Sequence, residues 1–487
     1  MNNITHKHLY FKSAIITIFA FIGVFLIHTP VKADDTATRL PIDITLSTSG
    51  RASNITDGSY YTELNFKSGD SITISSASDI YGLYIIWNKD VSEWNLEYNG
   101  SIIKCGTNGF LHEYVPIQNG TGSCTINILN DASICSIYAY SAGSLPSDVQ
   151  QWKAPCNGNT DILVLSTHAD DEILFLGGVL ATYGGNENLN VQVAYMCDFF
   201  ITESYREHEK LDGLWEAGIT HYPVKGSFKD IGSRSLTLAM SQYSYDDVLS
   251  YVTSCFRRFK PLVCVTQDLD GEYGHGGHML YAKAVSEALD ISNDASNYPE
   301  SAAQYGTWDV SKAYFHLYKE NPIKLDLQTP LANMGNRTAI QVAQDAYDKH
   351  VSQHKWDFAI TDKGFVTTGS ASYSCSDFGL YKTLVGSDTG NDMLENITTY
   401  EEQERLAKEA EEASIKAEEA SIEAESQKTA HSDSHIKITK TKIITIIILI
   451  IIFILAAFLS YKYYVLVQSR KKRNARKKKA SGKKESR

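Results

Sequence analysis

Two groups of histidine and carboxylate residues each follow a short apolar run of the sequence. THADDE, residues 167–172, comes directly after ILVLS (162–166), and GEYGHGGH, residues 271–278, follows PLVCVT (261–266). Neutral histidine nitrogen and carboxylate oxygen are ligands that zinc prefers in proteins. Apolar runs that alternate with helical stretches are typical of a mostly parallel sheet, where ligands bind at the carboxyl ends of the strands. The two loops therefore predict one metal site to which both contribute.

The first loop offers an imidazole and two adjacent carboxylates, from His168, Asp170 and Asp171. Two neighbouring aspartates cannot easily point the same way, so one can bind the metal while the other faces an open coordination position. The second loop offers His278, which stands 107 residues beyond Asp171. Either motif alone is weak, because an HxxH pair is common by chance and an acidic cluster is usually an exposed turn. The combination, with each motif after a buried strand, predicts a catalytic site.

The segment from about 160 to 390 resembles the LmbE-like, or PIG-L-type, zinc-dependent N-acetylglucosaminyl deacetylases. That family carries an AHPDDE motif early and a GxYGHPDH motif later, on a Rossmann-like α/β fold. The resemblance implies that His168, Asp171 and His278 bind one Zn²⁺ and that Asp170 is the general base. Three protein ligands would leave one coordination position for water, whose pKa the metal lowers.

Further roles also follow only from the resemblance. His275, expected to be protonated, would stabilise the oxyanion or protonate the leaving amine, and Tyr273 would lend a hydrogen bond. An RxxE helix of the family matches Arg206 and Glu209, and the arginine is expected to contact substrate; the alternative is a simple surface helix. Glu172 is expected to lie just behind the metal ligands.

The chain departs from the family's motifs at two positions. Ala169 replaces the proline of the first motif, which changes the stiffness of the loop but no ligand. Gly277 stands where the second motif has aspartate. That aspartate is not a ligand, but it could orient a neighbouring histidine, and the loss of such support typically costs 10- to 100-fold in affinity or activity.

The pattern around the catalytic segment predicts further domains. Residues 35–150 carry short alternating runs without helical periodicity, which favours a β sandwich. NITDG (54–58) and YGLYIIW (81–87) resemble segments of a galactose-binding-like jelly roll. Residues 158–398 form the predicted α/β domain. Residues 400–428, rich in Glu and Ala and free of Gly and Pro, predict a helical stalk, for which a single solvated helix is favoured over a coiled coil.

The two ends of the chain predict its location. Residues 1–33 read as a signal peptide, and 443–461 as a transmembrane helix of 19 uncharged residues. The tail 470–487 has eleven Lys and Arg against one Glu, so the positive-inside rule places it in the cytoplasm. We expect a single-pass membrane protein on a cell surface, that of a Gram-positive bacterium, with its catalytic domain outside.

The net charge of −12 argues against nucleic acid as a partner, because the part before the tail is strongly acidic. The eight cysteines permit disulfides in an oxidising compartment. Cys105, Cys124 and Cys135 are the bridge candidates, whereas Cys197 and Cys264 fall within predicted buried strands and are expected to be free thiols.

Three functions compete. The first is zinc-dependent removal of the acetyl group from N-acetylglucosamine in a glycan, glycoconjugate or polysaccharide. The second is a surface carbohydrate-binding or adhesion protein whose deacetylase-like domain is inactive, a reading motivated by Gly277. The third, a two-metal phosphoesterase, would need more clustered carboxylates than these loops offer.

Overall fold

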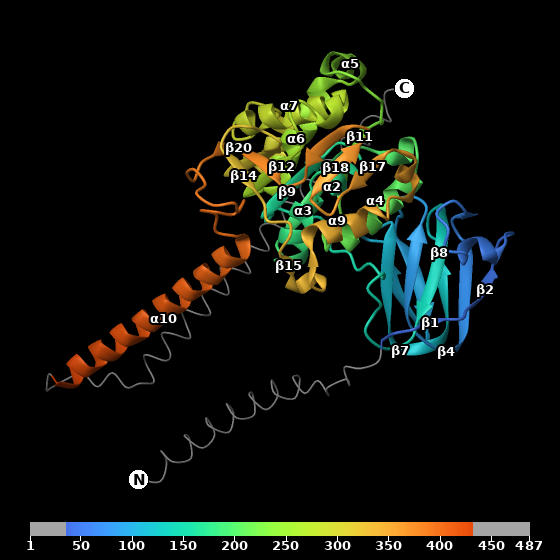
Figure 1. Ribbon diagram of the computed structural model, residues 1–487. Coiled ribbons are helices and arrows are strands. Elements are labelled where there is room, and N and C mark those ends of the chain that lie inside the picture. Colours follow the sequence, from blue (N-terminus) through green and yellow to red (C-terminus); the bar gives the residue numbers. More distant parts are fainter. Residues whose placement is uncertain (1–35, 432–487) are drawn as a thin grey trace, which may run out of the picture. The chain divides into compact units, whose positions relative to one another are not determined.

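The computed structural model describes residues 36–431 (Figure 1). One compact unit ends at Glu404, and the rest of the described chain continues helix α10 (Tyr400–His431), as predicted for 400–428. Within residues 36–431 no helix is both long and apolar enough to cross a membrane. The signal peptide (1–33), the membrane helix (443–461) and the basic tail (470–487) lie outside the described residues, so they stay predictions.

The first part of the compact unit is an antiparallel β domain, as the alternating runs predict. Its sheet has the order β1-β8-β4-β7-β5-β6, with β2 against β4 and β3 against β8. The strands are β1 (Arg39–Leu40), β2 (Asp43–Leu46), β3 (Leu64–Phe66), β4 (Ser71–Trp87), β5 (Trp94–Tyr98), β6 (Ser101–Cys105), β7 (His112–Asn127) and β8 (Ala132–Tyr140).

The long strand β4 changes partners along its length and so folds the sheet over its own core. Its first half pairs with β2, its second half pairs with β8, and β7 follows it throughout, with a register break between Ser75 and Ile80. Trp87 and Trp94 are fully buried between the layers. This all-β arrangement agrees with the predicted sandwich class, and the galactose-binding-like assignment stays a prediction.

The predicted disulfide candidates are wrong, because all eight cysteines are free and buried. Cys105 pairs with Trp94 at one end of β5, whereas Cys124 precedes Thr125, which aligns with Glu97 near the other end. The two cysteines are therefore offset by four residues, about 13 Å along the strands, and β5 lies between their strands, which puts the thiols beyond the reach of a disulfide. Cys135 packs in a different core cluster, apart from both.

The second part is an α/β domain around a seven-stranded sheet of order β11-β10-β9-β12-β13-β20-β14. The first five of these strands are parallel; β20 is antiparallel to β13, and the edge strand β14 is antiparallel to β20. The strands are β9 (Ile162–Ser166), β10 (Val191–Cys197), β11 (Val224–Phe228), β12 (Val263–Thr266), β13 (Lys312–His316), β14 (Pro322–Lys324) and β20 (Asp377–Thr383). The predicted mixed, mostly parallel α/β fold is confirmed.

Helices cover both faces of this sheet, because its strands are buried runs without a polar face (Figure 1). Helix α9 packs with α2, α3 and α4, while α6 packs with α7 and α8, and α5 packs with α7. The helices are α2 (Asp171–Leu174), α3 (Gly177–Val179), α4 (Tyr205–Glu216), α5 (Leu236–Gln242), α6 (Tyr245–Phe259), α7 (Gly276–Ile291), α8 (Pro299–Tyr305) and α9 (Ala339–Tyr347).

Short strands complete the domain beside these layers. They are β15 (Pro330–Leu331), β16 (Arg337–Thr338), β17 (Phe358–Ile360), β18 (Phe365–Thr368) and β19 (Ala371–Ser374). The pair β15–β16 leads into α9, whose first turn is closed by a capping box between Thr338 and Gln341. This capping fixes the start of α9, the helix that packs against α2 and α4 beside the first predicted loop.

The two domains meet at a buried pair of histidines. His112 of β7 lies with Nε2 2.9 Å from Nδ1 of His208 on α4. Tyr60 stacks on the His208 ring at 4.4 Å and donates a hydrogen bond to Asp212 of the same helix. Burial lowers the pKa of His112 to about 3, and burial also holds the pKa of His208 well below its usual range. The interface therefore contains two neutral imidazoles that acid must charge.

We expect the protein to lose stability in mild acid because of this pair. The ordinary pKa is about 6.5 in the unfolded chain and about 3 for folded His112, so the unfolded chain binds more protons between these values. The free energy of unfolding should then fall by up to about 1.4 kcal/mol per pH unit for each histidine as the pH drops below about 6.5. Urea unfolding at pH 7 and pH 5 measures this fall. His112→Gln should flatten it and exposed His354→Gln should not; an equally steep fall in His112→Gln would contradict the assignment.

Candidate metal centre and active site

The two predicted loops meet at the point where the strand order of the sheet reverses. β9 and β12 are neighbours in the sheet, and the chain leaves them toward opposite sides, the arrangement that opens a crevice at the carboxyl ends of strands. The loop after β9 brings His168, and the loop after β12 leads into α7, which carries His278 in its first turn. The fold therefore places both motifs at one site.

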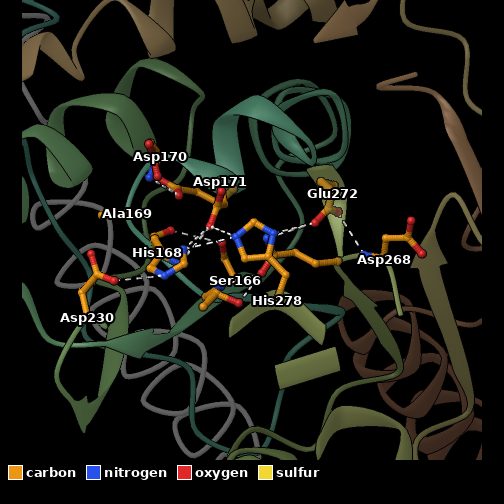
Figure 2. Close-up of polar contacts among 12 residues, drawn as sticks. Ser166, His168, Ala169, Asp170, Asp171, Asp230, Asp268, Glu272 and His278 are labelled. Carbon is orange, nitrogen blue, oxygen red and sulfur yellow. Dashed lines mark hydrogen bonds and ion pairs between the residues drawn. The ribbon is translucent and has the colours of Figure 1, made fainter. Parts of the chain in front are cut away.

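The three predicted metal ligands converge on one point, which Figure 2 shows. Oδ2 of Asp171 lies 2.8 Å from Nδ1 of His168 and 3.0 Å from Nε2 of His278, and the two nitrogens are 3.2 Å apart. Tetrahedral zinc with bonds of about 2.1 Å has ligand–ligand edges of about 3.4 Å, so a small expansion of this triangle would accommodate the ion. Two imidazoles and one carboxylate are also a donor set that suits zinc.

The charges of these groups support one another. Burial opposes ionisation of Asp171, but His278 and His168 outweigh it and hold the pKa of Asp171 well below its usual range. Burial likewise opposes protonation of His278, yet Asp171 and Glu272 raise its pKa to about 9. Asp171 thus pairs with both imidazoles, and a divalent cation bound by these three groups would take the place of the protons that they share.

A buried carboxylate behind His278 was missed by the sequence analysis. Glu272 lies with Oε2 2.8 Å from Nδ1 of His278 and with Oε1 2.8 Å from Nδ1 of His316 at the end of β13. This contact turns Nε2 of His278 toward Asp171 and fixes which nitrogen serves as a ligand. The only signal in the sequence was an acidic residue within GEYGHGGH, and nothing linked His316 to it.

Glu272→Gln is expected to weaken zinc binding by about 10- to 100-fold, because the amide offers one acceptor where two histidines need two. Competition with a chromogenic chelator measures the zinc dissociation constant. The matched control is Glu300→Gln on the exposed start of α8, which should bind zinc as the wild type does. Equal zinc affinity in all three proteins would show that Glu272 does not support the ligand.

The predicted base, Asp170, is held in an unusual backbone conformation beside the three ligands. Its φ is 134°, a value that residues with a side chain rarely adopt. Glu172 accepts a 2.8 Å hydrogen bond from the Asp170 amide, and Arg206 holds both the Ala169 carbonyl and, at 3.1 Å, Oδ1 of Asp170. Such strain persists only where the surroundings enforce it, and it commonly marks functional sites.

The environment of Asp170 suits proton transfer near neutral pH. Burial raises its pKa to about 7, although Arg206 favours the ionised form. A carboxyl group in this range can take a proton and give it up again near pH 7. Glu172 lies directly behind the loop, where burial raises its pKa to about 8, and it supports the loop through its hydrogen bond from the Asp170 amide.

Helix α4 is not a simple surface helix along the face that carries the RxxE pair. Arg206 is 5% exposed and Glu209 4% exposed, and Glu209 accepts hydrogen bonds from Ser352. The guanidinium of Arg206 contacts Asp170, and its Nη1 lies 3.7 Å from Asp230. In this structure Arg206 positions the candidate base; a contact with substrate stays a prediction.

Asp230, which sequence reasoning also missed, follows β11 and faces the other nitrogen of His168. Its Oδ1 lies 3.4 Å from Nε2 of His168. Burial opposes its ionisation, but His168 and Arg206 lower its pKa to about 2. No motif marks Asp230, because the sequence around it contains no further ligand at metal-site spacing. Its contact fixes the ring of His168 from the side opposite Asp171.

His275 and Tyr273 line the same centre. The His275 ring lies 4.6 Å from that of His278, and the Tyr273 ring lies 5.3 Å from it. Burial, followed by the charges of His168 and His278, lowers the pKa of His275 to about 3, which favours the neutral ring; the protonated His275 of the family stays a prediction. Burial raises the pKa of Tyr273, which keeps its hydroxyl protonated as a hydrogen-bond donor.

Gly277 explains part of the low pKa of His275. A Cβ at position 277 would lie 3.1 Å from Nδ1 of His275, so an aspartate there would stand against that nitrogen. In the described chain, Nδ1 of His275 is buried and has no hydrogen-bond partner. The chain therefore lacks the carboxylate that would raise the pKa of His275 and orient its ring.

Other groups of potential ligands overlap this centre. His275 lies close enough to join His168 and His278, and Cys197 and Asp230 surround the far side of His168. Burial raises the pKa of the Cys197 thiol, which disfavours the thiolate that zinc requires. The set of His168, Asp171 and His278 fits best, because it leaves Asp170 and His275 free beside it.

No protein-family model matches the chain. Among curated proteins, the chain is similar to 1D-myo-inositol 2-acetamido-2-deoxy-alpha-D-glucopyranoside deacetylase 1 of Catenulispora acidiphila, with 23% identity over 233 residues that cover 42% of this chain and 68% of that protein. It is 24% identical over 191 residues to the deacetylase of the same name from Rhodococcus opacus, covering 34% of this chain and 64% of that protein. These relatives support an enzyme of the deacetylase class.

Two solved structures with related names are also similar. N,N'-diacetylchitobiose deacetylase from Pyrococcus horikoshii aligns with a TM-score of 0.32 and 16% identity, covering 40% of this chain and 70% of that one. The zinc-inhibited form of teicoplanin deacetylase Orf2 aligns with a TM-score of 0.27 and 16% identity, covering 40% of this chain and 85% of that one.

Proposed function

We propose that this protein is a zinc-dependent hydrolase that removes the acetyl group from N-acetylglucosamine-type sugars in a glycan, glycoconjugate or polysaccharide. The observation that carries the proposal is the strained Asp170 beside the convergent His168, Asp171 and His278. Hydrolysis of an amide by water needs a general base beside a metal ion, and here a carboxyl group with a pKa near 7 lies beside three metal ligands.

Each residue has a role in this reaction. Zinc held by His168, Asp171 and His278 would acidify a water and polarise the acetamide carbonyl. Asp170 takes the proton of the attacking water, and Arg206 keeps its carboxylate in place for that transfer. The proton then passes to the amine, so that acetate and a free amino sugar leave.

The developing oxyanion needs hydrogen-bond donors rather than a proton. A neutral His275 donates from one ring nitrogen, and Tyr273 donates from its phenol. A neutral imidazole can act in this way, because its N–H group donates a hydrogen bond to the oxyanion without first taking up a proton. The absence of a carboxylate at position 277 then slows the reaction without abolishing it.

The location of the enzyme is part of the proposal. The sequence of 1–33 and of 443–461 supports secretion followed by a single membrane anchor, with the catalytic domain outside a Gram-positive cell. The substrate would then be an N-acetylated sugar at the cell surface.

Acetate release tests the function. The protein is incubated with N-acetylglucosamine and its oligomers, and with an O-acetylated sugar that has an ester in place of the amide. We expect acetate and a new primary amine in equal amounts from the N-acetylated sugars. Stoichiometric zinc without acetate from any of them would favour the alternative motivated by Gly277, an inactive domain in a surface carbohydrate-binding protein.

A further inference from the structure

A large cleft lies between the β domain and the α/β domain, beside the C-terminal half of α4. Its volume is about 1000 Å³, at the upper end of the range for pockets that bind small molecules. The β domain contributes Tyr84 and Tyr138 to its wall, and α4 contributes Asp212 and Trp215. Neither His168 nor any other metal-centre residue named above lines this cleft, so it is a separate site.

Five aromatic side chains line the cleft, four from the β domain and one from α4. Its aromatic lining consists of Tyr60, Tyr84, Tyr138, Tyr140 and Trp215. Tyr60 is fixed by its stack on His208, and Trp215 by an edge contact with Trp152 at 5.3 Å. Rings that are already held in place give up little conformational entropy when a ligand packs on them. The cleft therefore has a preorganised apolar surface.

The polar groups of the cleft are balanced in charge. Three cationic side chains line it, Arg39, Arg337 and Lys349, against the carboxyl groups of Asp148, Asp212 and Glu216. Burial raises the pKa of Asp212 to about 7, so this carboxyl group is only partly ionised at neutral pH. Ion pairs within the protein already occupy Arg337 and Lys349, which both contact Glu216. The lining thus has no excess of positive charge for a phosphate or a polyanion.

The cleft also contains polar groups that a purely apolar ligand would leave without partners. Asp212 accepts 2.6 Å hydrogen bonds from Tyr60 and from Gln150, and its second lone pairs remain available. The guanidinium of Arg39 lies 3.9 Å over the Tyr138 ring and forms no hydrogen bond or ion pair with the part of the chain that the structure describes. Its guanidinium therefore keeps its donors for a ligand or for water.

We propose that this cleft binds a neutral oligosaccharide. A pyranose ring has an apolar C–H face and a rim of hydroxyl groups, so it can pack on fixed aromatic rings while it hydrogen-bonds to carboxylate, amide and guanidinium groups. No charge on the ligand is needed, in agreement with the balanced lining. This inference does not rest on the proposed deacetylase activity, because the site is built by other residues.

Binding is measured by titration calorimetry with the full chain carrying Asp170→Asn, so that no substrate is consumed. The probes are the tetramer of N-acetylglucosamine and the tetramer of glucose, which lacks the acetamido group. We expect saturable binding of at least one tetramer. Arg39→Ala and Tyr138→Ala, each added to this background, should weaken it at least about threefold, the effect of losing one aromatic or cation contact.

Tyr381→Ala is the matched control, a half-exposed strand tyrosine on β20 outside the cleft, and it should bind as the parent does. Arg39→Ala keeps the test valid if Tyr138→Ala fails to fold, because Arg39 is exposed. Binding that is equal in parent, cleft variants and control would overturn the proposal, and so would no saturable binding of either tetramer. Acetate release is measured separately, so failure of the cleft and failure of the enzyme are distinguishable.

Discussion

Asp170→Asn is expected to lower kcat by about 10²- to 10⁴-fold while zinc stays bound, which is the range for loss of a general base. Asparagine matches aspartate in shape and can keep a hydrogen bond to Arg206, but its amide cannot accept the proton of the attacking water. The ligands His168, Asp171 and His278 are untouched by the change. Acetate release under saturating substrate, with zinc content measured on the same sample, gives the result.

Asp268→Asn is the matched control for this prediction. In Figure 2, Asp268 lies on the side of Glu272 that faces away from the metal ligand His278. Its side chain accepts a hydrogen bond from the Asp270 amide. The same carboxyl-to-amide change there should alter kcat by less than about threefold, because Asp268 contacts Glu272 through its backbone amide and not through the changed side chain. Near-wild-type kcat in Asp170→Asn with zinc bound would show that another group accepts the proton.

His278→Gln is expected to remove the metal and with it the activity. The side chain lies at the centre of the site, bound to Asp171 on one nitrogen and to Glu272 on the other. A catalytic metal supplies several kcal/mol to the transition state, so its loss should lower kcat/KM by at least about 100-fold in buffer without added zinc. Elemental analysis should find much less than one zinc per chain.

Zinc added in excess should restore part of the activity of His278→Gln, because two ligands remain. The matched control is His354→Gln on an exposed turn, which should keep one zinc and full activity. One tightly bound zinc together with unchanged turnover in His278→Gln would contradict the ligand assignment and would point to His275 as a ligand in its place.

The strands that support the site could be predicted from sequence because they are continuous apolar runs rich in Val, Ile and Leu. ILVLS and VQVAYMC coincide with β9 (Ile162–Ser166) and β10 (Val191–Cys197). Parallel strands buried on both faces leave this signal regardless of the rest of the fold. Once the strands were placed, the loops that follow them were placed too, and the proximity of His168 and His278 could be predicted.

The carboxylates that contact the histidine ligands from behind, Glu272 and Asp230, could not be predicted in the same way. Glu272 meets His316 across 44 residues, and Asp230 meets His168 across 62, through contacts that depend on how β11 and β13 are placed in the sheet. Such partners have no fixed spacing. The protonation of His275 was also beyond the sequence, because it depends on burial and on neighbouring charges.

The contacts between the β domain and the α/β domain could not be predicted from the sequence either. Tyr60 contacts Asp212 across 152 residues, and His112 contacts His208 across 96. Alternating apolar runs predict that a β domain exists but not which of its residues face a neighbour. The disulfide candidates were wrong for the same reason, since an even number of cysteines says nothing about the distances between them.

The central claim is that acetate release depends on one zinc ion held by His168, Asp171 and His278 next to Asp170. The most direct test strips the purified chain with a chelator and titrates zinc back while acetate release from N-acetylglucosamine oligomers is followed. Activity should be lost on stripping and should rise linearly to a plateau at one zinc per chain. Acetate release that persists in the stripped protein, or zinc that binds in a one-to-one ratio without restoring any activity, would contradict the claim.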